Sequence, residues 1–294
     1  MDLNGDGNVD ILSGCYSRRE KEMAGLFQVL WGNEDGTFNK AKGLKGTDGE
    51  LLIIPQGGQM GIVDAICTRP TAADIDGDGH LDIVSGNFAG TFCWFRGEGA
   101  GKFSPTPEWI LTPDGERLKV AQHSDPFLVD WDKDGDLDML SGSSSGGVNL
   151  IANVGSKTEP QFAKPIALVK AHEGSGKTVF GDEHIKAPQS STRVFAADVN
   201  GDGKLDLLIG DSTRLVFPAE GLSEEEARTA MEEWDAKSAE VSKMAPTITD
   251  YENMTDEQEK AMEEYSERSS ELYEQRSTFI KEESTGFVWL MLQK

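Results

Sequence analysis

Four nine-residue loops rich in aspartate, asparagine and glycine recur in this chain, and they constrain its fold more than any other feature. The loops occupy residues 2–10, 74–82, 130–138 and 198–206. Each is followed at once by a short β-branched and leucine-rich run that closes on glycine, a pattern typical of a strand. Repeated segments in matching contexts are the mark of a repeat architecture, in which each repeat is one supersecondary unit. We therefore expect several copies of one β-rich unit.

Every loop places oxygen-bearing side chains at positions 1, 3, 5 and 9 and glycine at position 6. Alternating side chains then converge on one centre, the backbone carbonyl of position 7 joins them, and the glycine permits the sharp turn. This arrangement suits a hard cation such as Ca²⁺. The predicted metal-binding residues, with position 7 acting through its carbonyl, are Asp2, Asn4, Asp6, Asn8, Asp10, Asp74, Asp76, Asp78, His80, Asp82, Asp130, Asp132, Asp134, Asp136, Asp138, Asp198, Asn200, Asp202, Lys204 and Asp206.

An EF-hand begins with the same spacing but ends on a bidentate glutamate at position 12, where this chain has serine three times and isoleucine once. The EF-hand interpretation therefore fails, and each loop is predicted to join two strands. A metal-free turn is the alternative for any single loop, but four copies in matching strand contexts argue against it. Loops 74–82 and 130–138 have four carboxylates at the ligand positions, whereas Asn4 and Asn200 each replace one charge, so the first and last loops are expected to bind more weakly.

The loops, together with the segments 32–38 and, more loosely, 97–103, resemble the FG-GAP/VCBS family of repeat proteins. The resemblance implies a β-propeller in which calcium loops connect the strands of the blades, with up to four structural Ca²⁺ ions. It covers residues 1–217 and 285–294, the expected propeller. The family is a scaffold shared by adhesins, integrin heads, lectin-like proteins and a few polysaccharide lyases, so the resemblance alone does not specify a function.

Each complete repeat is predicted to contain four strands, which in the second repeat are expected at 68–73, 81–85, 91–96 and near 108–111. The first repeat lacks its leading strand and the last lacks its outer strand, because of where the chain begins and ends. The expected fold is mainly β, a propeller of four blades or part of a larger one. Unpaired blade edges promote aggregation. We therefore favour a fragment, whose missing N-terminal segment carried a signal peptide and the closing strands, over a compact propeller with incomplete edges.

Residues 222–283 show a helical pattern in place of the strand signals. Capping boxes at 223–226 and 255–258 each precede apolar residues at three-to-four spacing, with Ala245 assigned to the first helix and Phe279 and Ile280 to the second. The segment is expected to form an antiparallel α-helical hairpin with a coiled-coil seam, inserted in the last blade.

The hairpin segment also carries 19 acidic and 7 basic side chains, so its net charge is −12, which is half of the net charge of −24 of the chain. A solvated helix surface explains this charge. Alternatively, the hairpin is an oligomerisation or partner-binding arm that presents its aromatic residues, which are Trp234, Tyr251, Tyr265 and Tyr273.

The net charge of −24 and the absence of any apolar run of about 18 residues exclude two classes of partner. A strongly acidic surface repels the phosphate backbone of nucleic acid, and no segment is apolar enough to cross a membrane. The three cysteines, Cys15, Cys67 and Cys93, are too few for a disulfide framework and are expected to be small buried hydrophobic residues. Calcium sites of this short type fill where calcium is plentiful, so a secreted, periplasmic or cell-surface location is expected.

Arg69, Asp125 and Arg193 each lie five places before the first aspartate of a loop, so in a propeller they would share one level near the central axis. His123 lies close by in sequence, and His184 could approach from a long loop. Intramolecular Arg–Asp pairing that closes the channel mouth is one interpretation, and a site for a glycan or carboxylate ligand is the other.

No nucleophile–base pair or histidine-rich cluster is evident in the sequence. We therefore predict a non-catalytic binding, adhesion or protein-interaction module with a protein or glycan partner. A carbohydrate-active enzyme, such as a polysaccharide lyase on the same scaffold, is the alternative.

Overall fold

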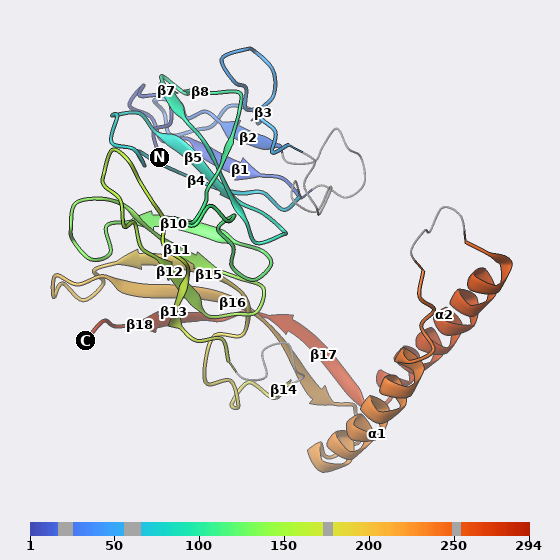
Figure 1. Ribbon diagram of the computed structural model, residues 1–294. Coiled ribbons are helices and arrows are strands. Elements are labelled where there is room, and N and C mark those ends of the chain that lie inside the picture. Colours follow the sequence, from blue (N-terminus) through green and yellow to red (C-terminus); the bar gives the residue numbers. More distant parts are fainter. Residues whose placement is uncertain (17–25, 56–65, 173–178, 249–253) are drawn as a thin grey trace. The chain divides into compact units, whose positions relative to one another are not determined.

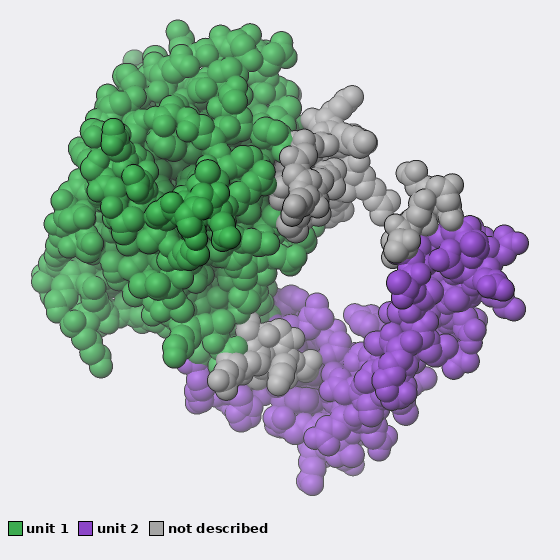
Figure 2. Space-filling model, viewed as in Figure 1, with its two compact units in different colours: residues 1–176, 187–213, 286–294 green, residues 177–186, 214–285 purple. Residues whose placement is uncertain are grey.

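The computed structural model describes residues 1–16, 26–55, 66–172, 179–248 and 254–294 (Figure 1). The chain forms two compact units (Figure 2). Unit 1 comprises residues 1–176, 187–213 and 286–294, and unit 2 comprises residues 177–186 and 214–285. Within the described ranges, neither helix of the protein is long and apolar enough to cross a membrane.

Unit 1 is a four-bladed β-propeller built from four antiparallel sheets. The first blade consists of β1 (Ile11–Gly14), β2 (Phe27–Leu30) and β3 (Lys42–Gly43). The second consists of β4 (Arg69–Ala73), β5 (Asp82–Gly86), β6 (Phe92–Phe95) and β9 (Glu108–Trp109). The third consists of β10 (Asp125–Val129), β11 (Asp138–Gly142), β12 (Val148–Ile151) and β13 (Ile166–Val169). The fourth consists of β15 (Ser190–Ala197), the first part of β16 (Asp206–Pro218) and β18 (Val288–Met291).

The predicted propeller fold is therefore confirmed, and the four strands expected in the second repeat lie within two residues of their observed bounds. The second, third and fourth loops join the first strand of a blade to the second, with the same register each time: Ala73 pairs with Asp82, Val129 with Asp138, and Ala197 with Asp206. The short hairpin of β7 (Gly97–Gly99) and β8 (Lys102–Phe103) was not expected as strands. Its glycine-rich sequence lacks the apolar alternation by which a strand is recognised.

The blades contact one another through their innermost strands, β1 with β4, β4 with β10 and β10 with β15. Apolar clusters fill the space between blades, and the ring of Phe27 on β2 meets that of Phe95 on β6 edge to face at 5.5 Å. Burying such a side chain completely stabilises a fold by about 1.5–3 kcal/mol. Cys67 and Cys93 are buried as expected, Cys15 is half-buried, and all three are free thiols.

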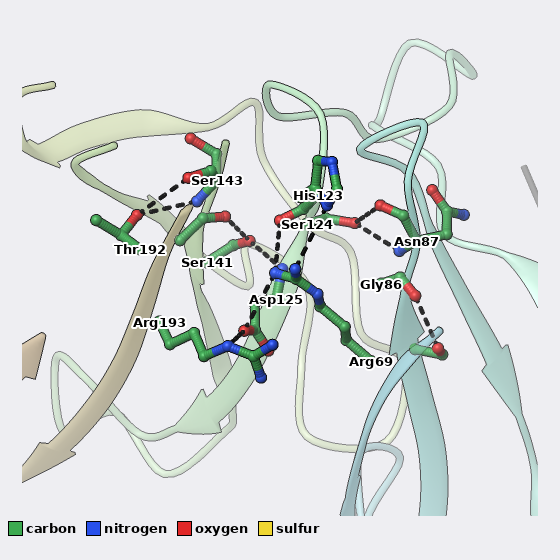
Figure 3. A network of polar contacts seen from close by, with 12 residues as sticks. Arg69, Gly86, Asn87, His123, Ser124, Asp125, Ser141, Ser143, Thr192 and Arg193 are labelled. Atoms are coloured by element: carbon green, nitrogen blue, oxygen red, sulfur yellow. Dashed lines mark hydrogen bonds and ion pairs between the residues drawn. The ribbon is translucent and has the colours of Figure 1, made fainter. Parts of the chain in front are cut away.

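The glycine that closes each of the first three apolar runs has a specific reason, which is the close approach of the next blade, whereas Gly210 at the end of the fourth run has open space around it. A Cβ added to Gly14 would lie 1.8 Å from the carbonyl oxygen of Thr68, and one added to Gly86 would lie 2.1 Å from that of Ser124. The same Ser and Thr residues fasten the blades, because Asn87 N donates to Ser124 Oγ at 2.9 Å and Cys15 N donates to Thr68 Oγ1 at 2.7 Å. Figure 3 shows the contacts at Asn87 and Ser124. A larger side chain here would force adjacent blades apart.

Unit 2 contains α1 (Glu224–Ser242), α2 (Asp256–Arg276), β14 (Val179–Phe180) and β17 (Ile280–Thr285). β14 and β17 both pair with β16. In β14, Val179 pairs with Leu215 and Phe180 pairs with Val216. Both predicted capping boxes are present, at Ser223 and at Thr255. The helical pair is confirmed, while the coiled-coil seam stays a prediction.

Three expectations about the hairpin are wrong. Ala245 lies beyond the end of α1, and Phe279 and Ile280 lie beyond the end of α2. Ile280 begins β17 instead, because its side chain is buried against Phe180 and Val216 and its backbone finds a strand partner. Trp234 is not presented for outside contact: it is half-buried, its Nε1 donates to Leu272 O at 2.6 Å, and the Arg276 guanidinium stacks on its ring. Tyr251 lies outside the described residues.

Candidate functional site

The last aspartate of every loop is a buried group with the same two hydrogen bonds. One carboxylate oxygen accepts the backbone N–H of loop position 2, as in Trp131 N to Asp138 Oδ2 at 3.0 Å. The other accepts an N–H that follows the third strand of the blade, as in Asn153 N to Asp138 Oδ1 at 2.8 Å. Burial raises the pKa of Asp138 and of Asp82. The equivalent N–H pairs belong to Leu3 and Gly32 at Asp10, Ile75 and Gly97 at Asp82, and Val199 and Gln293 at Asp206.

Loops 74–82 and 130–138 each bring three carboxylates together. Oxygens of Asp74, Asp76 and Asp78 lie within 4.8 Å of one another, as do oxygens of Asp130, Asp132 and Asp138. In both loops the first aspartate has a buried oxygen, Oδ1, that accepts no hydrogen bond from the described residues. A buried acceptor without a donor is costly, and a cation is the partner that a cluster of carboxylates lacks. These residues therefore fit a metal ion.

Position 7 of the third loop, which is predicted to offer its carbonyl, also has an acidic side chain. The side chain of Asp136 is buried, and its Oδ1 also has no hydrogen-bond partner in the described part of the chain. Burial raises its pKa, and the negative charges of Asp134, Asp138 and Asp132 raise it further. Loop 130–138 thus carries five carboxylates, more than any of the other three loops.

Loops 2–10 and 198–206 instead satisfy their own carboxylates. Asp2 Oδ1 accepts from Gly5 N at 2.8 Å, and the Asn4 amide donates to Asp6 Oδ2 at 3.0 Å. The fourth loop repeats this pattern, with Asn200 donating to Asp202 at 3.1 Å. Hydrogen bonds from the Asn8 backbone and then the Asn4 side chain lower the pKa of Asp6. An asparagine amide here occupies the oxygen that a cation would need, which gives the physical basis for expecting weaker sites in these loops.

A second group of polar residues surrounds a cavity of about 430 Å³, which we call the central pocket because all four blades contribute to it. Arg69 Nη1 and Arg193 Nε both contact the same oxygen, Asp125 Oδ2, at 3.4 Å (Figure 3). Arg69 Nη1 also donates to His123 O at 3.3 Å. The pocket is lined by Leu12, Ser13, Gly14, Cys15, Tyr16, Cys67, Thr68, Arg69, Pro70, His123, Asp125 and Arg193.

The structure thus brings together the three residues that the loop offset placed at one level. The side chains of Arg69 and Asp125 are 15% and 18% exposed, whereas that of Arg193 is 65% exposed. Burial raises the pKa of Asp125, against the opposing effect of the Arg193 and Arg69 guanidiniums. Burial, followed by the charges of Arg69 and Arg193, lowers the pKa of His123, so this imidazole is neutral at pH 7. His184 belongs to unit 2 and contacts Glu183 at 3.6 Å.

Comparisons with known proteins agree with the repeats seen in the sequence. Residues 74–141 and 130–209 each match the model of the FG-GAP-like repeat family. Residues 74–209 therefore consist of FG-GAP-like repeats. No curated protein matched it. Three chains of solved structures did. One is from a study of the recognition of non-reducing terminal N-acetylglucosamine by an Agrocybe aegerita lectin, with 20% identity and a TM-score of 0.37 over 71% of this chain and 45% of that chain.

The side chain of Arg96 contacts loop 74–82, and this contact was not predicted from the sequence. Arg96 Nη1 contacts Asp76 Oδ2 of loop 74–82 at 2.5 Å, and Arg96 Nε contacts Glu108 at 2.7 Å. Its guanidinium also stacks on Trp94 at 4.0 Å. The residue at this place in the other blades, directly before the N–H that binds the last loop aspartate, is Trp31, Ala152 or Leu292. Among the described residues at this place, only the one in the second repeat puts a guanidinium against a loop carboxylate.

Replacing Arg96 by methionine is expected to increase the calcium affinity of loop 74–82 by about two- to fivefold, since a partly exposed ion pair contributes roughly 0.2–1 kcal/mol. Isothermal titration in an Asp132→Ala background, which weakens loop 130–138, would isolate this site. Arg117→Met is the matched control, because Arg117 likewise stacks on a tryptophan, Trp109, at 3.9 Å. Unchanged affinity in the Arg96 variant would show that the guanidinium does not compete.

Proposed function

We propose that this FG-GAP propeller is a non-catalytic binding or adhesion module whose loops hold structural Ca²⁺. The observation that carries the proposal is the pair of buried, unpartnered oxygens at Asp74 and Asp130, each inside a cluster of three carboxylates. Carboxylate oxygens at alternating loop positions are the ligands that Ca²⁺ prefers. The ion would neutralise the clustered charge and hold the loop between its two strands.

The same chemistry supports a secreted, periplasmic or cell-surface location. Short extracellular calcium sites commonly bind with dissociation constants of about 10⁻⁴–10⁻³ M, so they fill only where calcium is plentiful. Loops 74–82 and 130–138 would fill first. Loops 2–10 and 198–206 would follow at higher concentration, because their asparagine amides must first release an aspartate oxygen.

A glycan or a protein is the proposed partner, because FG-GAP propellers serve as interaction scaffolds. The central pocket is also a polar cavity, and the side chain of Arg193 in it is exposed to solvent. A glycan array probed in millimolar Ca²⁺, followed by a degradation assay on each glycan that binds, tests the proposal. Binding without degradation supports a non-catalytic module. New unsaturated ends on a bound polysaccharide would overturn it in favour of a lyase, and an array without any bound glycan would favour a protein partner.

We also propose that the helices of unit 2 mediate self-association. Tyr273 is exposed on α2, Tyr265 is half-buried, and acidic residues surround both. Replacing residues 224–276 by a short Gly/Ser linker is expected to lower the sedimentation coefficient to that of a monomer. The Tyr265→Ala/Tyr273→Ala variant keeps both helices and should have the same effect. If neither variant changes the assembly state of the full chain, the helices do not mediate association.

A further inference from the structure

The central pocket contains an imbalance of charge. Two guanidiniums, of Arg69 and Arg193, face a single carboxylate, and both reach the same oxygen of Asp125. Both contacts are 3.4 Å long, whereas charge-assisted N–H···O hydrogen bonds are usually about 2.7–2.9 Å. His123 adds no further positive charge, since its imidazole is neutral at pH 7. Asp125 therefore neutralises one guanidinium charge at most, and the pocket keeps one surplus positive charge.

Arg69 is the arginine that most needs the Asp125 carboxylate, because it is the more buried of the two. Its side chain is largely buried, and burial lowers the pKa of its guanidinium, with the charge of Arg193 acting in the same direction. A buried charge is stable only when it is paired and hydrogen-bonded. Arg69 meets this requirement through Asp125 and His123, so the unpaired charge is that of Arg193, and a second anion in the pocket would neutralise it.

Arg193 provides the place for that anion. Only its Nε contacts Asp125, and its two terminal nitrogens, Nη1 and Nη2, have no protein partner in the described residues. These two nitrogens form the planar fork that binds a carboxylate through two parallel hydrogen bonds. The hydroxyl-bearing residue Ser13 also lines the pocket, so a bound molecule would have a further polar partner.

We propose that the central pocket binds a small organic carboxylate on Arg193, with Arg69 behind it. This deepens the proposed binding role, on which it rests, by assigning a ligand chemistry to one site. The volume of about 430 Å³ falls in the range of about 300–1,000 Å³ typical of small-molecule sites. A monoanion matches a surplus of one positive charge. A dianion such as phosphate would exceed it, in a protein whose net charge of −24 already repels anions.

The test is isothermal titration of the calcium-loaded full chain with glucuronate, lactate, glucose and inorganic phosphate at constant ionic strength. Glucuronate is expected to bind, glucose not to bind, and phosphate to bind more weakly than glucuronate. Lactate separates two sources of the carboxylate: equal binding of lactate means that the carboxylate alone is recognised, and weaker binding means that a sugar carries it. Both results support the proposal. No heat from either carboxylate, or tighter binding of phosphate, would overturn it.

Two substitutions locate the site. Arg193→Gln is expected to weaken glucuronate binding about tenfold or more, because it removes a charged pair of hydrogen bonds. Arg193→Lys keeps the charge but lacks the fork, so it should recover only part of the affinity. Arg117→Gln makes the same charge change at an exposed arginine that does not line the pocket, and it should leave binding unchanged. Equal affinity in the Arg193→Gln and Arg117→Gln variants would place the ligand elsewhere and overturn the proposal.

Asp125→Asn separates a ligand site from a purely structural ion pair. If the pocket takes a carboxylate, removing the resident carboxylate frees both guanidiniums, and glucuronate should bind several-fold more tightly. If the three residues only close the pocket, the variant is less stable and glucuronate does not restore its melting temperature. A negative result for carboxylate binding would not affect the calcium-dependent stability of the loops, on which the proposed function rests. Loss of that stability in the parent protein would instead contradict the proposed function.

Discussion

Millimolar Ca²⁺ is expected to raise the melting temperature of the propeller by about 5–10 °C, and a chelator is expected to reverse the shift. A ligand that binds only the folded state at ten times its dissociation constant stabilises that state by about 1.4 kcal/mol per site. Loops 74–82 and 130–138, with their unpartnered carboxylate oxygens, supply two such sites. For a unit of this size, each kcal/mol shifts the melting temperature by about 2–4 °C.

Differential scanning calorimetry of the full chain in Ca²⁺, in Mg²⁺ and in chelator would measure the effect. Mg²⁺ should shift the melting temperature less, because it demands near-ideal octahedral geometry and gives up its water reluctantly. The control is Asp78→Ala/Asp132→Ala, which removes one exposed carboxylate from each cluster. This variant should melt like the parent protein in chelator and should lose most of the shift in Ca²⁺. Equal melting temperatures of the parent protein with Ca²⁺ and with chelator would contradict a structural role for calcium.

The sequence predicts the blades well because two local signals coincide at every repeat. The loop spacing marks the turn, and the apolar run marks the strand after it. The nine-residue loop 74–82 therefore fixes the pairing of Ala73 with Asp82. The offset of five residues also placed Arg69, Asp125 and Arg193 correctly beside one another. These predictions succeed because they need only the geometry of a hairpin, repeated.

Contacts that depend on the third strand of a blade could not be predicted in this way. The contact between Arg96 and Asp76 joins residues 20 positions apart, across a hairpin whose exact register the sequence does not specify. The roles of aspartates within one loop are equally ambiguous, because a carboxylate that binds a cation and one that accepts two N–H groups have the same side chain. Asp138 shows this clearly, since it lies in a predicted metal cluster and also holds two backbone N–H groups.

The two hydrogen bonds of Asp138 lead to the second large effect, which should not depend on calcium. Asp138→Ala leaves the N–H groups of Trp131 and Asn153 without their acceptor, and its own position is 1% exposed, so water cannot easily replace the carboxylate. Each unpaired buried group costs about 1–3 kcal/mol, so the free energy of unfolding is expected to fall by about 3–5 kcal/mol. The urea midpoint measured in chelator would report this loss.

Asp132→Ala is the matched control for this prediction, because Asp132 lies in the same loop and in the same carboxylate cluster but is exposed. In chelator it should leave the urea midpoint nearly unchanged, whereas in Ca²⁺ both variants should lose stability. Asp206→Ala makes the equivalent change in the last blade and keeps the test possible if Asp138→Ala does not fold. Equal midpoints of the Asp132 and Asp138 variants in chelator would mean that Asp138 acts only through the metal, because a carboxylate that merely binds a cation contributes no stability when the cation is absent.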